Sequence, residues 1–232
     1  MDLVYVVGKG GLWGHNELKF SIRSAEKFLK FDRLFLVGYK PTFINDKATH
    51  ILIEDNQGHK YKNVTQKVKY ILDSKELSDE IIYMNDDFFL LKPYDPIPYL
   101  WNKPIREWVL HYPFFKGRYY QNIVELYENF PKGKFFETHF PIVYNRERAK
   151  FVMKKYQLPI TLMLRSHYAN EFEKDLQLQT EESKDYKLYG KKDVVALAKD
   201  TPFVSCTNEM ACDTLFKNFL ISRFPEKSSY EE

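Results

Sequence analysis

The chain has 232 residues, with 35 lysines and arginines against 32 aspartates and glutamates, and it carries 17 Tyr, 19 Phe and 3 Trp. This length is enough to bury a hydrophobic core and is most simply explained by one domain. The net charge of +3 excludes the concentrated basic surface of a dedicated nucleic-acid-binding protein, but it suits a protein that handles phosphorylated substrates.

The chain shows no sign of a membrane segment or a metal-binding cysteine pattern. No apolar run approaches the roughly 18 residues that span a bilayer, and residues 1–5 begin a strand pattern instead of a signal peptide. We therefore expect a cytosolic (cytoplasmic) protein. Cys206 and Cys212 fit no common zinc spacing, so we expect both to be reduced and packed.

The first ninety residues alternate between strand and helix patterns, which is typical of an α/β fold. Short apolar runs predict buried strands, and apolar side chains at helical spacing, such as Leu18, Ile22 and Ala25, predict amphipathic helices. Asn16 is positioned to cap the first helix. The expected strands lie at 3–7, 33–38, 50–53 and 80–84, and the expected helices at 16–29 and around 64–72.

Beyond Leu91 the pattern is less regular. Prolines at positions 93, 96, 98 and 104 do not fit a helix interior or a central strand. We therefore expect cap or insertion segments within about 94–205 of a single domain, 1–232. Helical spacing returns near 123–130, 149–156 and 215–220, whereas the charged stretch 171–192 predicts a solvated hairpin or loop.

The strand expected at 80–84 ends in Asn85, Asp86 and Asp87. Ionised side chains at the end of a buried strand are costly unless they are solvated, paired or bound to a metal. Carboxylates are preferred ligands of Mg²⁺ and similar hard cations, so we expect a divalent cation at Asp87, with Asp86 or Asn85 beside it. In an extended segment, Asn85 and Asp87 would face the site and Asp86 would point aside. The competing interpretation is an ordinary polar turn.

Ligands of parallel α/β sheets bind at the carboxyl ends of the strands. The glycine loop 8–11 after the first strand and the Asn85–Asp87 step are therefore expected to converge on one edge. Gly8 permits close approach of the backbone to a ligand. The loop is not a P-loop, because no Gly-Lys-Ser or Gly-Lys-Thr follows.

Four groups of segments, read in chain order, carry a family resemblance. They are residues 2–8 with 16–24, residues 83–89 (Tyr-Met-Asn-Asp-Asp-Phe-Phe), residues 138–141 with 164–166, and residues 206–209 with 224–231. Together they resemble the sequence blocks of the Stealth family, which includes bacterial capsular polysaccharide phosphotransferases and the lysosomal-targeting GlcNAc-1-phosphotransferase. The chain departs from the family pattern at 8–11, where Trp-Val-Asp-Gly is usual, and at Glu209, where Asp is usual.

The resemblance implies a nucleotide-sugar-binding three-layer α/β sandwich similar to the GT-A glycosyltransferase fold. It also implies a divalent cation, Mg²⁺ or Mn²⁺, and a nucleoside-diphosphate sugar as donor. The implied metal ligands are Asp87, Asn85, Asp86 and Asn208, and Glu209 would add a further ligand. For Asn208 and Glu209, the alternative is an ordinary helix N-cap. The implied catalytic residues are His139, Arg165, Glu17 and Asp87, and the implied substrate-binding residues are Arg23, Asn16, Gly8 and Ser166.

Each of these side chains has a chemical role and a structural alternative. His139 is a candidate general base toward an acceptor hydroxyl, or a donor to developing phosphate charge, and a structural histidine is the alternative. Arg165 offers a fixed fork of N–H donors for phosphate oxygens. The alternative is that it forms a surface salt bridge. Glu17 and Arg23 are expected to orient the sugar and the phosphate. The alternative for both is ion pairing on the surface of a helix.

Three functions are compatible with these residues. The first is a transferase that moves a sugar phosphate from a nucleotide sugar to a hydroxyl on a glycan or related polymer. The second is a metal-dependent glycosyltransferase that releases the nucleoside diphosphate and acts on a glycan, a protein or a modified nucleic-acid base, the nucleic acid being the less favoured acceptor. The third is a catalytically silent binding module, against which Asp87, His139 and Arg165 together argue.

Overall fold

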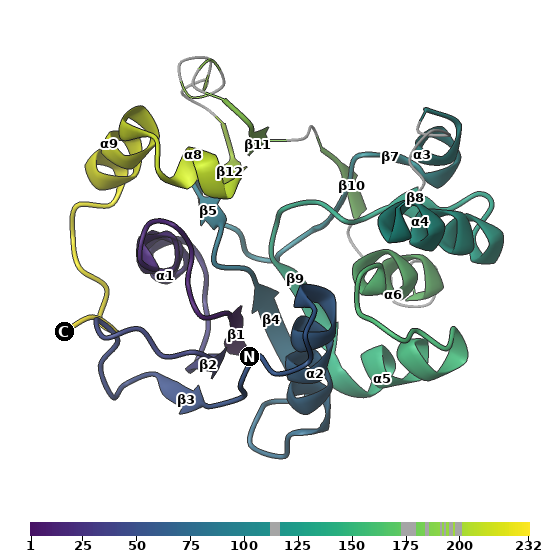
Figure 1. The fold of residues 1–232 in the computed structure, drawn as a ribbon, viewed down its shortest axis with the longest axis horizontal. Helices are drawn as coiled ribbons and strands as arrows, with labels where there is room; N and C mark the ends of the chain where they lie inside the picture. The colour runs from purple at the N-terminus through teal and green to yellow at the C-terminus, as the bar shows by residue number, and fades with distance from the viewer. Residues whose placement is uncertain are drawn as a thin grey trace.

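A five-stranded sheet lies at the centre of the molecule (Figure 1). The computed structural model describes residues 1–111, 117–172, 180–183, 186–190, 192, 194, 197 and 201–232. Four strands are parallel, and β9 pairs antiparallel with β4 at one edge. The order is β3-β2-β1-β4-β9, with β1 at Asp2–Val7, β2 at Leu34–Gly38, β3 at Thr49–Ile51, β4 at Glu80–Met84 and β9 at Ile142–Asn145.

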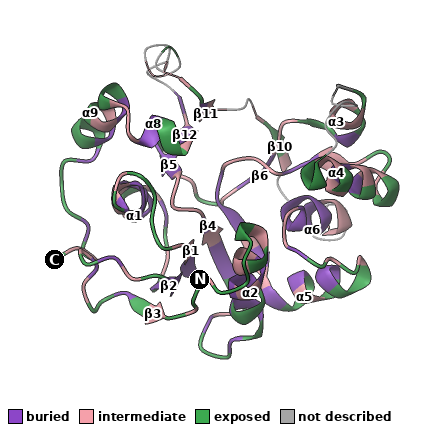
Figure 2. Ribbon diagram, in the orientation of Figure 1, coloured by how far each residue is buried: buried purple, intermediate pink, exposed green. Residues whose placement is uncertain are grey.

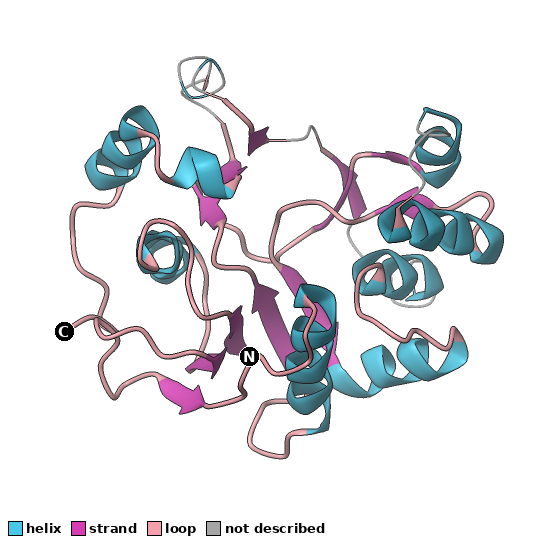
Figure 3. Ribbon diagram, viewed as in Figure 1, coloured by secondary structure: helices cyan, strands magenta, loops and turns pink. Residues whose placement is uncertain are grey.

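Helices cover both faces of this sheet, so the core has three layers (Figure 3). Helix α1 (Asn16–Phe28) packs on one face, and α2 (Lys60–Asp73) with α5 (Arg146–Lys155) packs on the other. Along β1, Tyr5 joins the α1 cluster and Val4 joins the opposite cluster. A strand that is buried on both faces in this way is mostly apolar, and Figure 2 shows this burial along β1 and β2.

The expected α/β order of the first ninety residues is confirmed, with small shifts at the ends of the elements. The expected cap of α1 is wrong. His15 occupies the cap position in the left-handed conformation, with φ 64°, and Asn16 is the first helical residue. The His15 ring stacks on Tyr39 with centroids 4.8 Å apart, a contact that favours a backbone conformation uncommon for residues other than glycine.

Residues 94–205 contribute β9 and α5 to the central sandwich. They also build a smaller unit around α3 (Ile105–His111) and α4 (Arg118–Asn129), whose core includes Ile123 and Leu126. The remaining elements are β5 at Phe88–Leu90, β6 at Tyr99–Trp101, β7 at Lys103–Pro104, β8 at Lys134–Phe135, α6 at Leu164–Phe172, β10 at Thr180–Glu182, β11 at Lys187–Leu188, β12 at Phe203–Cys206, α8 at Asn208–Ala211 and α9 at Thr214–Arg223.

The charged stretch 171–192 lies partly outside the described residues. Its described parts end α6 and supply two short strands, of which β10 pairs with β6 and β11 pairs with β12. Both cysteines are free thiols, with Cys206 buried and Cys212 partly exposed. Within the described ranges, no helix is long and apolar enough to cross a lipid bilayer.

Candidate active site

The polar step after β4 forms a tight turn. The backbone N–H of Phe88 donates to the carbonyl of Asn85 across 3.3 Å, which closes the turn over Asp86 and Asp87. The expected alternation, with Asp86 pointing aside, is therefore wrong, because the segment is not extended. Asn85, Asp86 and Asp87 all line one cavity at the carboxyl edge of the sheet.

Two serines of α1 hold this turn in place. The hydroxyl of Ser21 donates to the carbonyl of Phe88 at 2.6 Å, and the backbone N–H of Leu90 donates to the hydroxyl of Ser24 at 3.1 Å. Both serines are fully buried. Buried hydroxyls need such partners, so these serines fix the backbone of β5 directly after the turn.

The cavity at this edge, which we call the edge cavity, has a volume of about 550 Å³. It lies where the neighbouring parallel strands β1 and β4 end, and the glycine loop and the N-terminal turn of α2 form its other walls. The expected convergence of the glycine loop with the Asn85–Asp87 turn is thus confirmed. Gly8 lines the edge cavity, as does Asn208 at the start of α8, whose cap is Thr207 and not Asn208.

Burial raises the pKa of both carboxyl groups of the turn. The pKa of Asp87 rises to about 7, through desolvation first and the neighbouring Asp86 second. Desolvation, followed by the charge of Glu17, also raises the pKa of Asp86. A cation would relieve this repulsion, and two carboxylates with the Asn85 amide are suitable oxygen ligands for Mg²⁺ or Mn²⁺. The described residues hold no cluster of three His, Cys, Asp or Glu side chains arranged for a metal, so substrate oxygens and water would complete the shell.

Glu17 lies behind the glycine loop and does not line the edge cavity. It is 7 % exposed, and its Oε1 lies 2.8 Å from the position that a Cβ on Gly11 would take. A side chain at residue 11 would displace this carboxylate. Glu17 adds negative charge beside Asp86, and its direct contact with a sugar stays a prediction.

A second cavity of about 600 Å³, which we call the aromatic cavity, adjoins the first. Lys60, Val64, Tyr83 and Asn85 line both cavities, so these side chains form the boundary between the two. Helices α3 and α4 supply part of the wall of the aromatic cavity. Its aromatic lining includes Tyr61, Trp108, Tyr119, Tyr120, Phe135 and Tyr144.

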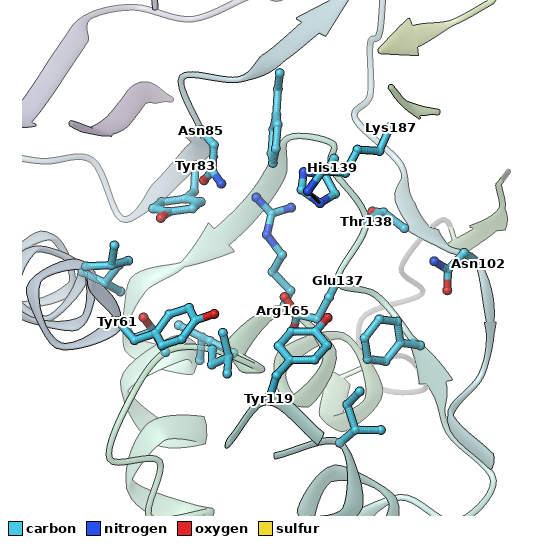
Figure 4. A pocket seen from close by; sticks show the side chains of 18 of the residues that line it. Tyr61, Tyr83, Asn85, Asn102, Tyr119, Glu137, Thr138, His139, Arg165 and Lys187 are labelled. Atoms are coloured by element: carbon cyan, nitrogen blue, oxygen red, sulfur yellow. Dashed lines mark hydrogen bonds between the residues drawn. The ribbon is translucent and has the colours of Figure 1, made fainter. Parts of the chain in front are cut away.

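His139 lines the aromatic cavity beside Lys187 (Figure 4). The carboxylate of Asp87 faces the other nitrogen of its ring. The Nζ of Lys187 lies 3.2 Å from Nε2, and because an ammonium only donates, Nε2 is the acceptor. The neutral ring then carries its proton on Nδ1, which is 3.8 Å from Oδ2 of Asp87 and has no hydrogen-bond partner among the described residues. Burial, and then the charges of Lys187 and Arg165, lower the pKa of His139 to about 3. The approach to Asp87 is therefore not an ion pair.

Arg165 extends from α6 into the space between Tyr83 and His139 (Figure 4). Its Nη1 donates to the carbonyl of Phe140, whereas Nη2 is buried without a hydrogen-bond partner in the part of the chain that the structure describes. The guanidinium lies 5.4 Å from the ring centroid of Phe88 and 5.6 Å from that of Tyr83. Because Arg165 is only 8 % exposed, the surface salt bridge is excluded. A buried donor without an acceptor is costly, so Nη2 is available to an acceptor that enters the aromatic cavity.

Ser166 lines neither cavity, so its direct contact with substrate stays a prediction. It is fully buried, and its hydroxyl accepts from the backbone N–H of Phe136 at 2.9 Å. Its own backbone N–H donates to Oε1 of Glu137 at 3.0 Å. Ser166 therefore positions Glu137, which lines the aromatic cavity. Burial raises the pKa of Glu137 to about 7, although the charge of Arg165 acts in the opposite direction.

Arg23 also lines neither cavity, and its contact with substrate stays a prediction. Its Nε and Nη2 donate to the carboxylate of Glu231 at 2.6 and 2.7 Å, and its Nη1 donates to the carbonyl of Phe224. This pair attaches the C-terminal segment to α1. Asn16 lines neither cavity. Its side-chain amide donates to the carbonyl of Trp13. Glu209 is exposed and lines neither cavity as well.

Sequence reasoning missed several charged residues of the two cavities. Lys67 is the clearest case, because it falls on the same helical face as Val64, Val68 and Ile71. A lysine within an apolar stripe is a signal that the helix buries a charge. Lys187 lies in a charged stretch and offers no such signal. The other missed residues are Asp55, Lys60 and Glu137.

No protein-family model matches the chain, and no curated protein matches it either. The residues of the two cavities and the four sequence blocks are therefore the basis for assigning a function.

Proposed function

We propose that the protein is a metal-dependent transferase that moves a sugar phosphate from a nucleoside-diphosphate sugar to a hydroxyl group on a glycan or related polymer. One observation carries the proposal. The Asn85–Asp87 turn opens into the edge cavity, which adjoins the cavity that holds His139 and Arg165, and Nδ1 of His139 lies 3.8 Å from Oδ2 of Asp87. A diphosphate at the turn would thus lie within reach of a buried guanidinium and of an imidazole.

The proposal includes membership of the Stealth family and a GT-A-like form of the α/β sandwich. All four sequence blocks contribute residues to the two cavities, namely Gly8, Asn85 to Asp87, His139 with Arg165, and Asn208. These residues are far apart in the chain. Their proximity supports a common role for the blocks, and a ligand site at the carboxyl ends of parallel strands fits the general rule for such sheets.

Donor binding rests on charge neutralisation. A divalent cation at Asp86 and Asp87, when bound, would neutralise the diphosphate and stabilise the leaving phosphate. Asn85 contributes an amide oxygen, and the Nη2 atom of Arg165 would donate to a phosphate oxygen. Backbone at Gly8 leaves space for a ligand to approach β1 closely.

His139 is the proposed base for the acceptor. The diphosphate charge offsets the charges of Lys187 and Arg165, which raises the pKa of His139 once the donor is bound. The acceptor hydroxyl then replaces Lys187 at Nε2 and gives its proton to that nitrogen while its oxygen bonds to the sugar-side phosphorus. The bond from that phosphorus to the bridging oxygen breaks, and the nucleoside monophosphate leaves.

The leaving nucleotide tests the proposal. The protein is incubated with a panel of nucleotide sugars, Mn²⁺ or Mg²⁺ and candidate glycan acceptors, and the nucleotide products are separated by chromatography. Release of the monophosphate with transfer of sugar phosphate is expected, and the Asp87→Ala variant should lose it. Release of the diphosphate would show the metal-dependent glycosyltransferase instead. Absence of metal-dependent nucleotide-sugar binding would overturn both. Asp46→Asn, at an exposed carboxylate, is the matched control.

A further inference from the structure

A buried ion pair lies at the edge cavity, on the side away from the Asp86–Asp87 turn. The Nζ of Lys67 donates to Oδ1 of Asp55 at 2.6 Å and to the carbonyl of Val7 at 2.9 Å. The side chain of Lys67 is 2 % exposed, whereas that of Asp55 is 21 % exposed. Both residues line the edge cavity.

The surrounding backbone is shaped to hold this pair. Gly38, at the end of β2, has φ +123°, and a Cβ there would lie 2.0 Å from the carbonyl of Val7 and 3.0 Å from Nζ of Lys67. Residue 38 therefore has to be glycine for Lys67 to reach the end of β1. Three elements, β1, β2 and α2, thus combine to fix one ammonium group.

Stability alone does not account for the pair. Buried ion pairs contribute little net stability compared with apolar residues of similar volume, and Lys67 lies on an otherwise apolar face of α2. The pair has a clear geometric effect instead. Lys67 binds Oδ1 of Asp55 and leaves Oδ2 near Gly8. Oδ2 lies 3.6 Å from the position that a Cβ on Gly8 would take.

The charge of the pair also suits a phosphorylated ligand. An unpaired carboxylate in this cavity would repel a diphosphate bound nearby. Lys67 cancels the charge of Asp55 but leaves one carboxylate oxygen as a hydrogen-bond acceptor. Strands β1 and β4 are neighbours, about 5 Å apart, so a ligand with its diphosphate at the Asp86–Asp87 turn must extend over β1 to reach Asp55.

We propose that Asp55, held by Lys67, accepts a hydrogen bond from the nucleoside part of the donor and thereby sets nucleotide specificity. The donor group is an N–H of the base or a hydroxyl of the ribose. This inference rests on the proposed function, because it takes the edge cavity as the nucleotide site. Lys67 is a positioning residue in this arrangement.

The test compares Asp55→Asn with the unchanged protein by calorimetric titration in Mn²⁺. The amide keeps an acceptor for Lys67 but presents an N–H to the nucleoside. Affinity for the preferred nucleoside diphosphate should fall roughly 10- to 100-fold, the scale of one charged hydrogen bond. Affinity for inorganic pyrophosphate should stay within about twofold, because pyrophosphate has no nucleoside.

A contact of Asp55 with the base is distinguished from one with the ribose by titrating the four nucleoside diphosphates and their 2′-deoxy forms. Loss of discrimination among bases in Asp55→Asn assigns a base N–H, and loss of discrimination against the deoxy form assigns the 2′-hydroxyl. Equal affinity of both proteins for every nucleotide would overturn the inference while leaving the proposed function intact. A parallel loss of pyrophosphate binding would overturn it as well.

Two further proteins complete the design. If Asp55→Asn fails to fold, the double variant Asp55→Asn with Lys67→Met removes both charges and takes its place, with the same expected losses. Glu231→Gln, which breaks a buried ion pair outside both cavities, controls for a general loss of stability and should bind nucleotides normally. If the unchanged protein binds neither nucleotides nor pyrophosphate, the proposed function fails and the inference fails with it.

Discussion

The Nδ1 atom of His139 faces Oδ2 of Asp87 at a distance of 3.8 Å. On the other side of the ring, Lys187 donates to Nε2. The imidazole is thus held between one residue of the proposed metal site and one cation. Its protonation is set by these neighbours and by burial, so charge changes around it have measurable effects.

Substitution of the cation should raise the pKa of His139. Burial is the main cause of its low value of about 3, and Lys187 is the next. In Lys187→Met we expect the pKa to move upward, part of the way to the ordinary 6.5, when the ring resonances are followed by NMR against pH. Lys154→Met, at an exposed position of α5, should change nothing. An unchanged value in Lys187→Met would contradict the arrangement described for the ring.

Asp87→Ala should abolish metal-dependent turnover without unfolding the protein. The side chain supplies charge to the edge cavity, and removing one such electrostatic contributor typically costs about 10²- to 10³-fold in rate. The fold should survive, because desolvation of this carboxylate raises its pKa to about 7 and opposes folding when it is ionised. Turnover and thermal unfolding are measured side by side. A variant that unfolds would indicate that Asp87 is chiefly structural.

Glu137→Gln should stabilise the protein at high pH. The pKa of Glu137 is raised from 4.5 to about 7 in the folded state, so its ionisation opposes folding. Stability is unaffected below pH 4.5, falls as the pH rises through 4.5 to 7, and stays reduced above 7. At pH 8 the amide should raise the free energy of unfolding by roughly 1–3 kcal/mol, while at pH 4 the two proteins should be equal. Urea unfolding at the two pH values measures the difference, and an equal gain at both would point to a cause other than ionisation.

Arg165→Lys should lower turnover although the charge is kept. The guanidinium binds the carbonyl of Phe140 through Nη1 and offers Nη2 to a ligand, and a single ammonium cannot do both in this geometry. We expect kcat to fall about 10²- to 10³-fold, with a smaller change in KM for the donor. Arg148→Lys, on the neighbouring helix α5 and lining neither cavity, should have normal kinetics. Near-normal turnover in Arg165→Lys would remove Arg165 from the proposed mechanism.

Glu231→Gln should reduce stability and leave activity unchanged. The side chains of Arg23 and Glu231 are 12 % and 3 % exposed, and the loss of one partner of a buried pair costs roughly 3–5 kcal/mol. Chemical denaturation measures this loss, and turnover is then assayed well below the unfolding temperature. A selective loss of turnover would support Arg23 as a substrate-binding residue.

Local patterns in the sequence predicted much of the fold. The period of apolar residues such as Leu18, Ile22 and Ala25 depends only on near neighbours, and it located the strands and helices of the first ninety residues. The rule that ligands bind at strand ends then placed Gly8 and Asp87 together at one edge. The second half was less predictable, because Pro93 and Pro96 mark a break in the pattern without showing that β9 returns to the central sheet.

The α/β order, the acidic turn and the edge of the sheet where that turn lies follow from local sequence patterns, because each depends on short-range periodicity and on strand direction. Which side chains meet depends on the three-dimensional fold. Arg23 pairs with a residue 208 positions away, and Lys67 reaches the end of β1 because Gly38 has no side chain. Partners of this kind depend on the packing of distant segments, and no local pattern encodes their contact.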